Sequence, residues 1–530
     1  CKVYSMARIH RVLAIIGLML IILATTTTLA YTNVTYQQPT TKVKNVIFLI
    51  GDGMGLSHIR LTQLAYGRLA LEYFTDIGIV YTDTLSGEVP DSAAAGTALA
   101  TGVKTENGMI SMVPVNGKLV SVMTLLELAQ KLGKSTGLIT TTRITHATPA
   151  VFASHVPDRE MEVEIAEQLI EHGVDVLMGG GLKRFSEDLL EKAREEGYTV
   201  IFNKTQLLEL EGAKKVLGLF AWSHIPYVLD RDETVPSLVD MVAKAIDILD
   251  DNPNGFFLMV EGGRIDHAAH GNDAPSVVAE TKEFDEVVGL ALNYALSRDD
   301  TLVIVVADHE TGGLAVGGYG YGQVINFTLL LGVKASAIHM AEEIQGGADP
   351  KTVIQKYTGI TITDEEAQEI LSALQENFYA GATKIGNIIS KYIGIAWATS
   401  KHTGQPVIVF AYGPGSYLFR GVHHETDIAK TIATLMLFGT TKPLTTITLA
   451  PSPVPGDING DGVVDSADAY IVRRSFLGEK VDTLLEKHID MNGNGIIDLE
   501  DVYILYTGNY GKPLTPTMLS PQLELAYLRR

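Results

Sequence analysis

The sequence predicts an α/β fold with a mainly parallel sheet, because short apolar runs alternate with amphipathic stretches from residue 45 to about residue 437. Apolar runs of this length, bounded by turn residues, are typical of buried strands. The runs expected to form strands are 46–50, 174–178, 256–260, 302–307 and 407–412. At 530 residues the chain exceeds one ordinary domain, so at least one further domain should accompany this core.

The chain is acidic, with 62 Asp and Glu residues against 41 Lys and Arg residues and a formal net charge of -21. No run rich in Lys and Arg occurs beyond the extreme N-terminus. Because nucleic acid binding requires a basic surface, this composition argues against a nucleic acid partner. The hydrophobic content of 46% is sufficient for a large buried core.

The N-terminal segment has the pattern of a signal peptide over residues 1–30. Basic residues precede an apolar run at 12–24, and Thr28-Leu29-Ala30 resembles a signal-peptidase site. The apolar run is shorter than the roughly 20 residues that span a bilayer, so cleavage is favoured over retention as an N-terminal anchor. We therefore expect a secreted or cell-surface protein.

Two further segments interrupt or follow the predicted core, which extends over 45–440. Between 322 and 401 the pattern changes to helical periodicity, and Thr363 with Glu366 has the spacing of a capping box. We interpret this segment as a helical insertion. Residues 441–456 are rich in Pro, Thr and Ser, a composition typical of an extended linker, so a second domain should follow them.

Three of the predicted strands lead directly into acidic residues. These are Asp52 within a Gly-Asp-Gly turn, Glu261, and Asp308 followed by His309. Open α/β sheets bind ligands outside the carboxyl ends of their strands. Carboxylate and imidazole groups are the side chains that bind zinc and related cations. The sequence therefore predicts a metal site at this edge of the sheet.

Other candidate ligands lie close to these strand ends in the sequence. Asp266 and His270 are four residues apart, so they share one face of a helical turn and can bind one ion. His402 precedes the last predicted strand and supplies a further imidazole. Thr148 offers a hydroxyl ligand, and Arg159, eleven residues later, offers a bidentate clamp for phosphate.

Ser92 follows Asp91 at the expected start of a helix built from small residues. The positive end of the helix dipole would stabilise an anion beside its hydroxyl, and the small side chains leave room for a phosphoryl group. A plain N-cap is the alternative interpretation of an isolated Asp-Ser pair.

These stretches, in this order, resemble the alkaline phosphatase family over residues 45 to about 437. The matching motifs are Gly-Asp-Gly-Met-Gly, Asp-Ser-Ala-Ala, Ala-Thr-Pro-Ala, Val-Glu-Gly-Gly-Arg-Ile-Asp-His, Ala-Asp-His and His-Thr-Gly. The resemblance implies a three-layer α/β/α core and a phosphoric monoester hydrolase. It also implies that Ser92 is the nucleophile, which forms a covalent phosphoserine, and that Arg159 binds the substrate phosphate.

The resemblance implies three metal ions, two Zn²⁺ and one Mg²⁺. The implied ligands are Asp266, His270 and His402 for the first zinc, Asp52, Asp308 and His309 for the second, and Asp52, Thr148 and Glu261 for the third ion. His146 and His267 stand beside the third site where other members have Asp and Lys, and His267 is also expected to contact substrate. Because imidazole favours Zn²⁺ or Co²⁺ over Mg²⁺, the identity of the third ion stays open.

Residues 457–512 contain two copies of a twelve-residue calcium-loop pattern, with Gly at position 6. The predicted ligands are Asp457, Asn459, Asp461, Val463, Asp465 and Asp468 in the first copy, and Asp490, Asn492, Asn494, Ile496, Asp498 and Asp501 in the second. Asp at position 12 departs from the usual EF-hand and resembles dockerin modules, which implies a small all-α domain with two Ca²⁺ ions. The implied partner is a cohesin-bearing scaffold or cell-surface protein. Residues 513–530 form a tail.

The sequence thus predicts an exported, metal-dependent alkaline phosphatase that hydrolyses phosphate monoesters and is tethered by a dockerin-like domain. A phosphodiesterase or sulfatase of the same superfamily is the rival enzyme class, and a non-catalytic phosphate-binding scaffold subunit is the rival outside enzymes. Ser92 with Arg159 favours monoesters, because Arg159 would bind two charged non-bridging oxygens, whereas the two non-bridging oxygens of a diester share a single negative charge. The physiological substrate and the oligomeric state, a homodimer included, stay open.

Overall fold

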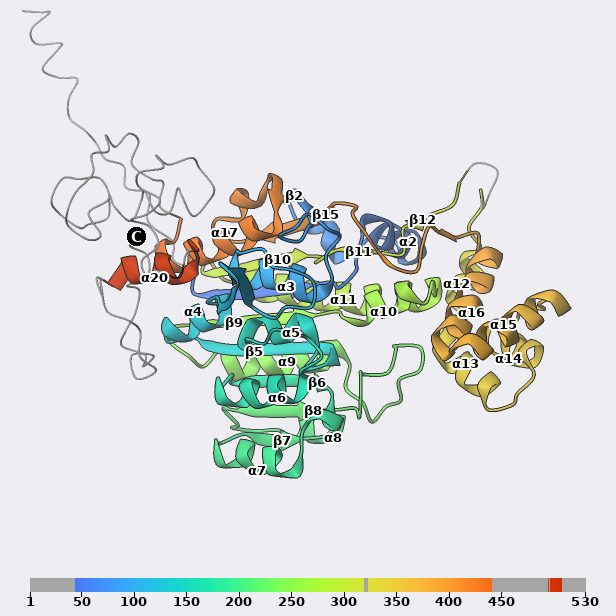
Figure 1. The fold of residues 1–530 in the computed structure, drawn as a ribbon, viewed down its shortest axis with the longest axis horizontal. Helices are drawn as coiled ribbons and strands as arrows, with labels where there is room; N and C mark the ends of the chain where they lie inside the picture. The colour runs from blue at the N-terminus through green and yellow to red at the C-terminus, as the bar shows by residue number, and fades with distance from the viewer. Residues whose placement is uncertain (1–42, 319–322, 441–493, 495, 508–530) are drawn as a thin grey trace, which may run out of the picture. The chain divides into compact units, whose positions relative to one another are not determined.

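The computed structural model describes residues 43–318, 323–440, 494 and 496–507. Its centre is a ten-stranded sheet (Figure 1). In spatial order the strands are β16 (Gly421–His424), β2 (Asp76–Tyr81), β15 (Val407–Tyr412), β10 (Thr301–Val306), β1 (Asn45–Ile50), β9 (Phe256–Glu261), β5 (Ser135–Arg143), β6 (Val176–Gly180), β8 (Val216–Leu219) and β7 (Thr199–Ile201). The five predicted strands are all present, and the α/β prediction is confirmed.

The sheet is mainly parallel, as predicted. β1 lies at its centre and pairs in parallel with both β10 and β9, and every residue of these three strands is buried. β15 is the exception, because it runs antiparallel to β10 and to β2. Continuous apolar runs are typical of strands covered on both faces, and here helices cover both.

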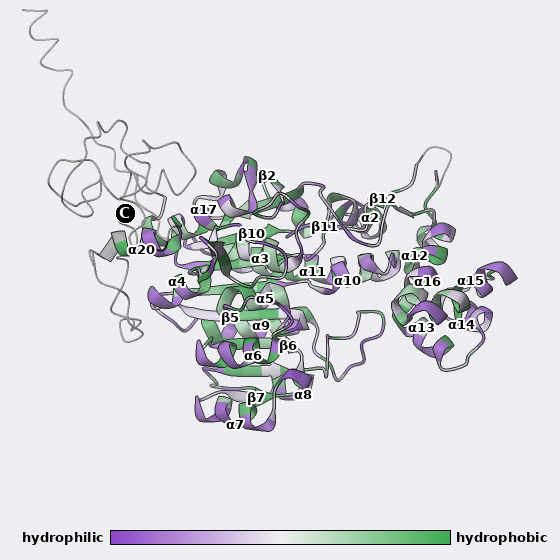
Figure 2. Ribbon diagram, in the orientation of Figure 1, coloured by the Kyte–Doolittle hydropathy of each residue, from purple (hydrophilic) through white to green (hydrophobic). Residues whose placement is uncertain are grey.

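Two groups of helices pack within themselves on the two faces of the sheet, which gives the three-layer α/β/α arrangement. One group contains α3 (Ser92–Thr101), α4 (Leu125–Lys131), α5 (Ala147–Ala153), α6 (Glu162–Glu171) and α17 (Glu425–Phe438); the other contains α2 (Leu56–Tyr66), α9 (Leu238–Leu249) and α11 (Ala274–Leu296). Figure 2 shows apolar residues concentrated between these layers, while α7 (Glu187–Glu195) is mostly hydrophilic.

The segment expected to form a helical insertion contains five helices, whose apolar side chains form a second cluster together with Leu61 on α2 and with Ala274 and Val278 on α11. They are α12 (Phe327–Gly332), α13 (Ala337–Gln345), α14 (Pro350–Thr358), α15 (Asp364–Glu376) and α16 (Phe378–Ile393). The capping box at the start of α15 is formed: Glu366 N donates to Thr363 Oγ1 at 3.1 Å, and Thr363 N donates to Glu366 Oε2 at 3.0 Å.

Only the end of the second calcium-loop pattern lies within the described residues. Asn494 Oδ1 accepts a hydrogen bond from Ile496 N at 2.8 Å. Asp501, in the first turn of α20 (Leu499–Thr507), accepts one at Oδ2 from Asp498 N at 2.9 Å. The first loop, Asp490, Asn492, the linker and the predicted signal peptide lie outside the described residues. None of the described helices is long and apolar enough to cross a membrane.

Candidate functional site

The three acidic strand ends meet at one edge of the sheet. In the parallel register, Ile50 lies beside Glu261 on one side and beside Val306 on the other. Asp52 and Asp308 each follow their strand by two residues, and both are fully buried, as is Glu261. Their proximity therefore follows from the order β10–β1–β9, which brings residues 256 positions apart in the sequence to the same edge.

Asp266, His270 and His402, predicted to bind one ion, lie together. His270 Nε2 is 3.3 Å from Asp266 Oδ2 and 3.1 Å from His402 Nε2, while His402 Nε2 is 3.6 Å from Asp266 Oδ1. The Nδ1 atoms of the two histidines lie 2.8 Å from Ser400 O and 2.9 Å from Pro90 O. A Nδ1 proton held by a backbone carbonyl leaves Nε2 as the free donor atom, which is the usual arrangement of zinc-binding histidines.

Asp52, Asp308 and His309, predicted to bind a second ion, also converge. His309 Nε2 lies 3.6 Å from Asp52 Oδ1 and 3.4 Å from Asp308 Oδ2. Asp308 Oδ1 accepts hydrogen bonds from Gly53 N and His309 N, so its other oxygen remains available. The His309 and His402 rings stack with centroids 3.6 Å apart, which joins this group to the first one.

Among the residues expected around a third ion, His146 lies close to the carboxylates of Glu261 and Asp52. His146 Nδ1 lies 3.9 Å from Glu261 Oε1, and a nitrogen of His146 falls within 4.8 Å of oxygens of both Glu261 and Asp52. We expected His146 behind the ligands, and its Nδ1 lies close enough to these carboxylates to be a ligand as well. Thr148 is fully buried at the start of α5.

The chemistry of this edge fits cations. Within the described part of the chain, six buried atoms of these residues have no hydrogen-bond partner: Asp52 Oδ1 and Oδ2, His146 Nδ1, Thr148 Oγ1, Glu261 Oε1 and Asp308 Oδ2. Buried polar atoms are rarely left unpaired, so their concentration in one place indicates a missing positive partner. Burial, followed by the charges of neighbouring carboxylates, raises the pKa of Asp52 well above its usual value and that of Asp308 to about 7.

Ser92 is the first residue of α3, and its side chain faces the histidines. Asp91 caps the helix by accepting a hydrogen bond from Ala94 N. Ser92 Oγ lies 3.4 Å from His309 Nε2, and Ser92 is 3% exposed. The hydroxyl therefore combines a position at the positive end of a ten-residue helix with direct contact to a candidate metal ligand.

Arg159 reaches the same place from the loop after α5. Its Nη1 donates to Asp91 Oδ2 at 2.9 Å, and its Nη2 lies 3.1 Å from His146 Nε2. The guanidinium thus lies between the residue before Ser92 and the third predicted metal group. Asp91, which the sequence indicated only as a helix cap, is also the anchor of Arg159.

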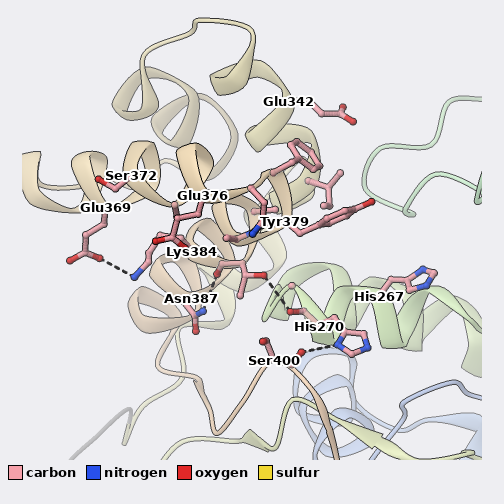
Figure 3. A pocket seen from close by; sticks show the side chains of 18 of the residues that line it. His267, His270, Glu342, Glu369, Ser372, Glu376, Tyr379, Lys384, Asn387 and Ser400 are labelled. Atoms are coloured by element: carbon pink, nitrogen blue, oxygen red, sulfur yellow. Dashed lines mark hydrogen bonds and ion pairs between the residues drawn. The ribbon is translucent and has the colours of Figure 1, made fainter. Parts of the chain in front are cut away.

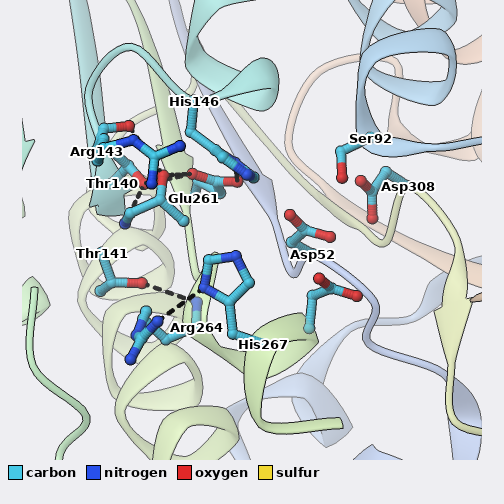
Figure 4. Close-up of polar contacts among 12 residues, drawn as sticks. Asp52, Ser92, Thr140, Thr141, Arg143, His146, Glu261, Arg264, His267 and Asp308 are labelled. Atoms are coloured by element: carbon cyan, nitrogen blue, oxygen red, sulfur yellow. Dashed lines mark hydrogen bonds and ion pairs between the residues drawn. The ribbon is translucent and has the colours of Figure 1, made fainter. Parts of the chain in front are cut away.

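Residues that sequence reasoning missed surround Glu261 and His267 (Figure 4). Thr140 and Thr142, at the end of β5, both donate hydrogen bonds to Glu261 Oε2, which leaves Oε1 free. The His224 ring centroid lies 4.5 Å from that of His267. Nothing in the local sequence marked these residues, because two threonines in a strand and a lone histidine in a loop are ordinary.

A cleft of about 1590 Å³ extends from this edge toward the helical insertion (Figure 3). His267 and His270 line its inner end, together with His224 and Arg264. Tyr379, on α16, lines the outer part and is 72% exposed. The cleft would give a substrate access from solvent to the histidines.

The sequence of this chain is similar to known families over both of its predicted domains. The alkaline phosphatase family model matches residues 43–438, and the dockerin type I domain model matches residues 455–507. Alkaline phosphatase 4 of Bacillus subtilis is 38% identical over 423 residues, which covers 76% of this chain and 91% of that protein.

Solved structures show the same similarity. The cold-active alkaline phosphatase of Shewanella sp. has a TM-score of 0.68 and 33% identity, covering 74% of this chain and 99% of that one. The enzyme from the Antarctic bacterium TAB5 is represented by a variant in which one histidine is replaced by aspartate, with Mg bound in its M3 site. That structure has a TM-score of 0.57 and 28% identity, covering 76% of this chain and 99% of that one.

Proposed function

Because the chain belongs to the alkaline phosphatase family and hydrolyses phosphate monoesters, we propose that it does so through a phosphoserine on Ser92 in a metal-dependent site. The observation that carries this proposal is the position of the Ser92 hydroxyl, 3.4 Å from His309 Nε2. His309 belongs to one candidate zinc group, and its ring stacks on that of His402 in the other group, so the nucleophile faces the place where the two groups join.

The chain's own residues account for the covalent step. Ser92 Oγ attacks phosphorus and forms a P–O bond while the ester bond to the leaving alcohol breaks. The N-terminus of α3 favours the negative charge on the phosphoryl oxygens. Arg159, held by Asp91, would bind two of the non-bridging oxygens and keep phosphorus in line with Oγ. Water then hydrolyses the phosphoserine and restores the hydroxyl.

The metal ions would be held by the three groups of residues described above. When bound, zinc ions supply positive charge that favours the deprotonated hydroxyl of Ser92 and the departing alkoxide. Asp266, His270 and His402 would hold one, and Asp52, Asp308 and His309 the other. The contacts of His270 and His402 with Ser400 O and Pro90 O, and the hydrogen bond that Asp308 accepts from Gly53 N, orient three of these ligands before any ion binds.

The third site would be formed by Asp52, Glu261, Thr148 and His146. The Nδ1 atom of His146 is buried and without a hydrogen-bond partner among the described residues, which suits a direct metal bond. An imidazole ligand favours Zn²⁺ or Co²⁺ over Mg²⁺. In the TAB5 enzyme, Mg occupies the M3 site of a variant with aspartate in place of a histidine, which supports this assignment.

We also propose that the chain is exported and that its C-terminal domain binds two calcium ions and a cohesin on a scaffold or cell surface. The match to dockerin type I over residues 455–507 supports this. In the second loop, Asp498 Oδ1 accepts a hydrogen bond from Glu500 N, and burial followed by the charge of Glu500 raises the pKa of Asp498 to about 7. A buried carboxylate beside another acid is suited to a cation.

The experiment that tests this function compares turnover of 4-nitrophenyl phosphate with that of bis(4-nitrophenyl) phosphate, across pH, with and without a chelator. We expect turnover of the monoester to exceed that of the diester by at least a hundredfold and to disappear with chelation. Preferred turnover of the diester would identify a phosphodiesterase. Absence of turnover in zinc-loaded protein that still binds phosphate would identify a binding subunit.

A further inference from the structure

A second group of metal-binding side chains lies outside the catalytic edge. It consists of Glu127 on α4, His155 in the loop after α5, and His172 at the end of α6. One ligand atom from each lies within 4.8 Å of the other two. From this geometry we propose that Glu127, His155 and His172 form a structural zinc site that joins α4, α6 and the loop carrying Arg159.

The distances suit a tetrahedral zinc ion. Zinc binds nitrogen and oxygen at about 2.0 Å, so two of its ligand atoms lie about 3.3 Å apart. His155 Nε2 is 3.0 Å from Glu127 Oε1, and His172 Nδ1 is 3.9 Å from the same oxygen. Both nitrogens therefore approach one carboxylate oxygen and lie within 4.8 Å of each other, so small side-chain shifts would place all three atoms around one ion. Two imidazoles and one carboxylate are a zinc donor set rather than a calcium or magnesium one.

The orientations of His155 and Glu127 are already determined by other contacts. His155 Nδ1 lies 2.9 Å from Ser111 O, so the carbonyl accepts the Nδ1 proton and directs Nε2 toward Glu127, where a zinc ion would replace the Nε2 proton. His270 and His402 have the same arrangement at the catalytic edge. Thr124 N donates to Glu127 Oε2, which leaves Oε1 for the ion. The carboxylate is ionised at neutral pH: burial opposes its charge, but His155 lowers the pKa of Glu127 to about 2.

Glutamine side chains hold the backbone of both histidines. Gln168 Oε1 accepts a hydrogen bond from His155 N at 2.7 Å, and Gln130 Nε2 donates to His172 O at 2.9 Å. The geometry of the group therefore does not depend on the ion pair between Glu127 and His155.

The ion pair between Glu127 and His155 does not explain the position of His172. Its Nδ1 is buried and has no hydrogen-bond partner in the described part of the chain, although its side chain is 26% exposed. Burial lowers the pKa of His172, so its ring is neutral and can bind a metal. With side-chain exposures of 16–26% across the three residues, water can occupy the fourth position of the ion.

The test counts zinc in the full-length chain. The wild-type protein, His172→Gln, Glu127→Gln and the control His423→Gln are equilibrated with micromolar Zn²⁺ in saturating Ca²⁺ and Mg²⁺. Gel filtration and elemental mass spectrometry then give zinc per chain. His423 lies on β16 and belongs to none of the metal-binding groups found among the described residues. Glu127→Gln keeps the acceptor for Thr124 N, so the start of α4 should be preserved.

We expect the wild-type chain and His423→Gln to bind one more zinc ion than His172→Gln and Glu127→Gln. Equal zinc content in the wild-type chain and in His172→Gln would overturn the proposal and leave an ordinary ion pair between Glu127 and His155. Far-UV circular dichroism shows whether each variant is folded. If His172→Gln is unfolded, the zinc content of Glu127→Gln is compared with that of the wild-type chain instead. This variant changes only one oxygen to nitrogen, so we expect it to fold.

Discussion

Asp91→Asn tests whether the carboxylate beside the nucleophile positions Arg159. Asn is as good an N-cap as Asp, so α3 should begin at the same residue. The variant removes the charge that pairs with Arg159 Nη1 at 2.9 Å. A hydrogen bond between charged groups contributes about 1.5–3 kcal/mol. About a fifth of each side chain is exposed to solvent, so we take the bottom of this range, about 1.5 kcal/mol, or slightly more than tenfold in affinity.

The assay is inhibition of monoester turnover by inorganic phosphate. The inhibition constant of phosphate should rise about tenfold in Asp91→Asn, because Arg159 loses its orientation while keeping its charge. The melting temperature should fall only slightly, because a loss of this size is a small part of the stability of so large a domain. Asp250→Asn is the matched control: it breaks an ion pair with Arg298, 2.6 Å long, before the amino end of β9, at the opposite edge of the sheet. An inhibition constant within twofold of wild type in Asp91→Asn would refute the anchoring role of Asp91.

Three other perturbations test the remaining assignments. Ser92→Ala should remove nearly all turnover and retain phosphate binding; a residual kcat above about a tenth of wild type, a barrier change below about 1.4 kcal/mol, would exclude Ser92 as the nucleophile. His146→Asp with His267→Lys should make turnover respond to added Mg²⁺, and an unchanged activation profile would show that neither position selects the third ion. Calcium should increase the helicity of the isolated residues 456–512, since so short a segment has a small core; no change up to millimolar Ca²⁺ would reject calcium-dependent folding.

The sequence predicted the parts of the fold that depend on local pattern. The run at 46–50 is apolar throughout, so burial on both faces could be expected before its partners were known. β5 was missed because six of its nine residues are Ser, Thr or Arg, although seven are buried. The antiparallel direction of β15 was not predictable either, because an apolar run carries no information on the direction of its neighbours.

In the candidate site too, some contacts were predictable from local sequence pattern and others were not. Asp52, Asp308 and His309 could be placed together because each follows a buried strand. The link between Asp91 and Arg159 joins residues 68 positions apart, and only the tertiary structure brings them into contact. His146 was expected behind the ligands, but the helix that it caps, α5, brings its Nδ1 toward Glu261. Side-chain distances of this kind depend on packing, which sequence spacing does not determine.

The buried acids of the catalytic edge should make the metal-free chain sensitive to pH, and Asp308 gives the clearest case. Its pKa is about 7 in the metal-free fold against an ordinary value of 3.8, with burial as the main cause. The folded chain therefore binds more protons than the unfolded chain between these values, so the contribution of Asp308 to stability falls as the pH rises from about 4 to 7. Bound cations would reverse this by pairing with the carboxylate.

Asp308→Asn isolates this contribution. Asn keeps the oxygen that accepts from Gly53 N and His309 N, but it cannot ionise. In chelator, the melting temperature of the wild-type chain should fall relative to that of Asp308→Asn as the pH rises from 4 to 7. With zinc present the order should reverse, because the variant lacks a charged ligand. Parallel melting curves for the two chains across this pH range in chelator would show that Asp308 is already paired without metal. The site would then be assembled by its own hydrogen bonds, and not by the cations that its unpaired oxygens indicate.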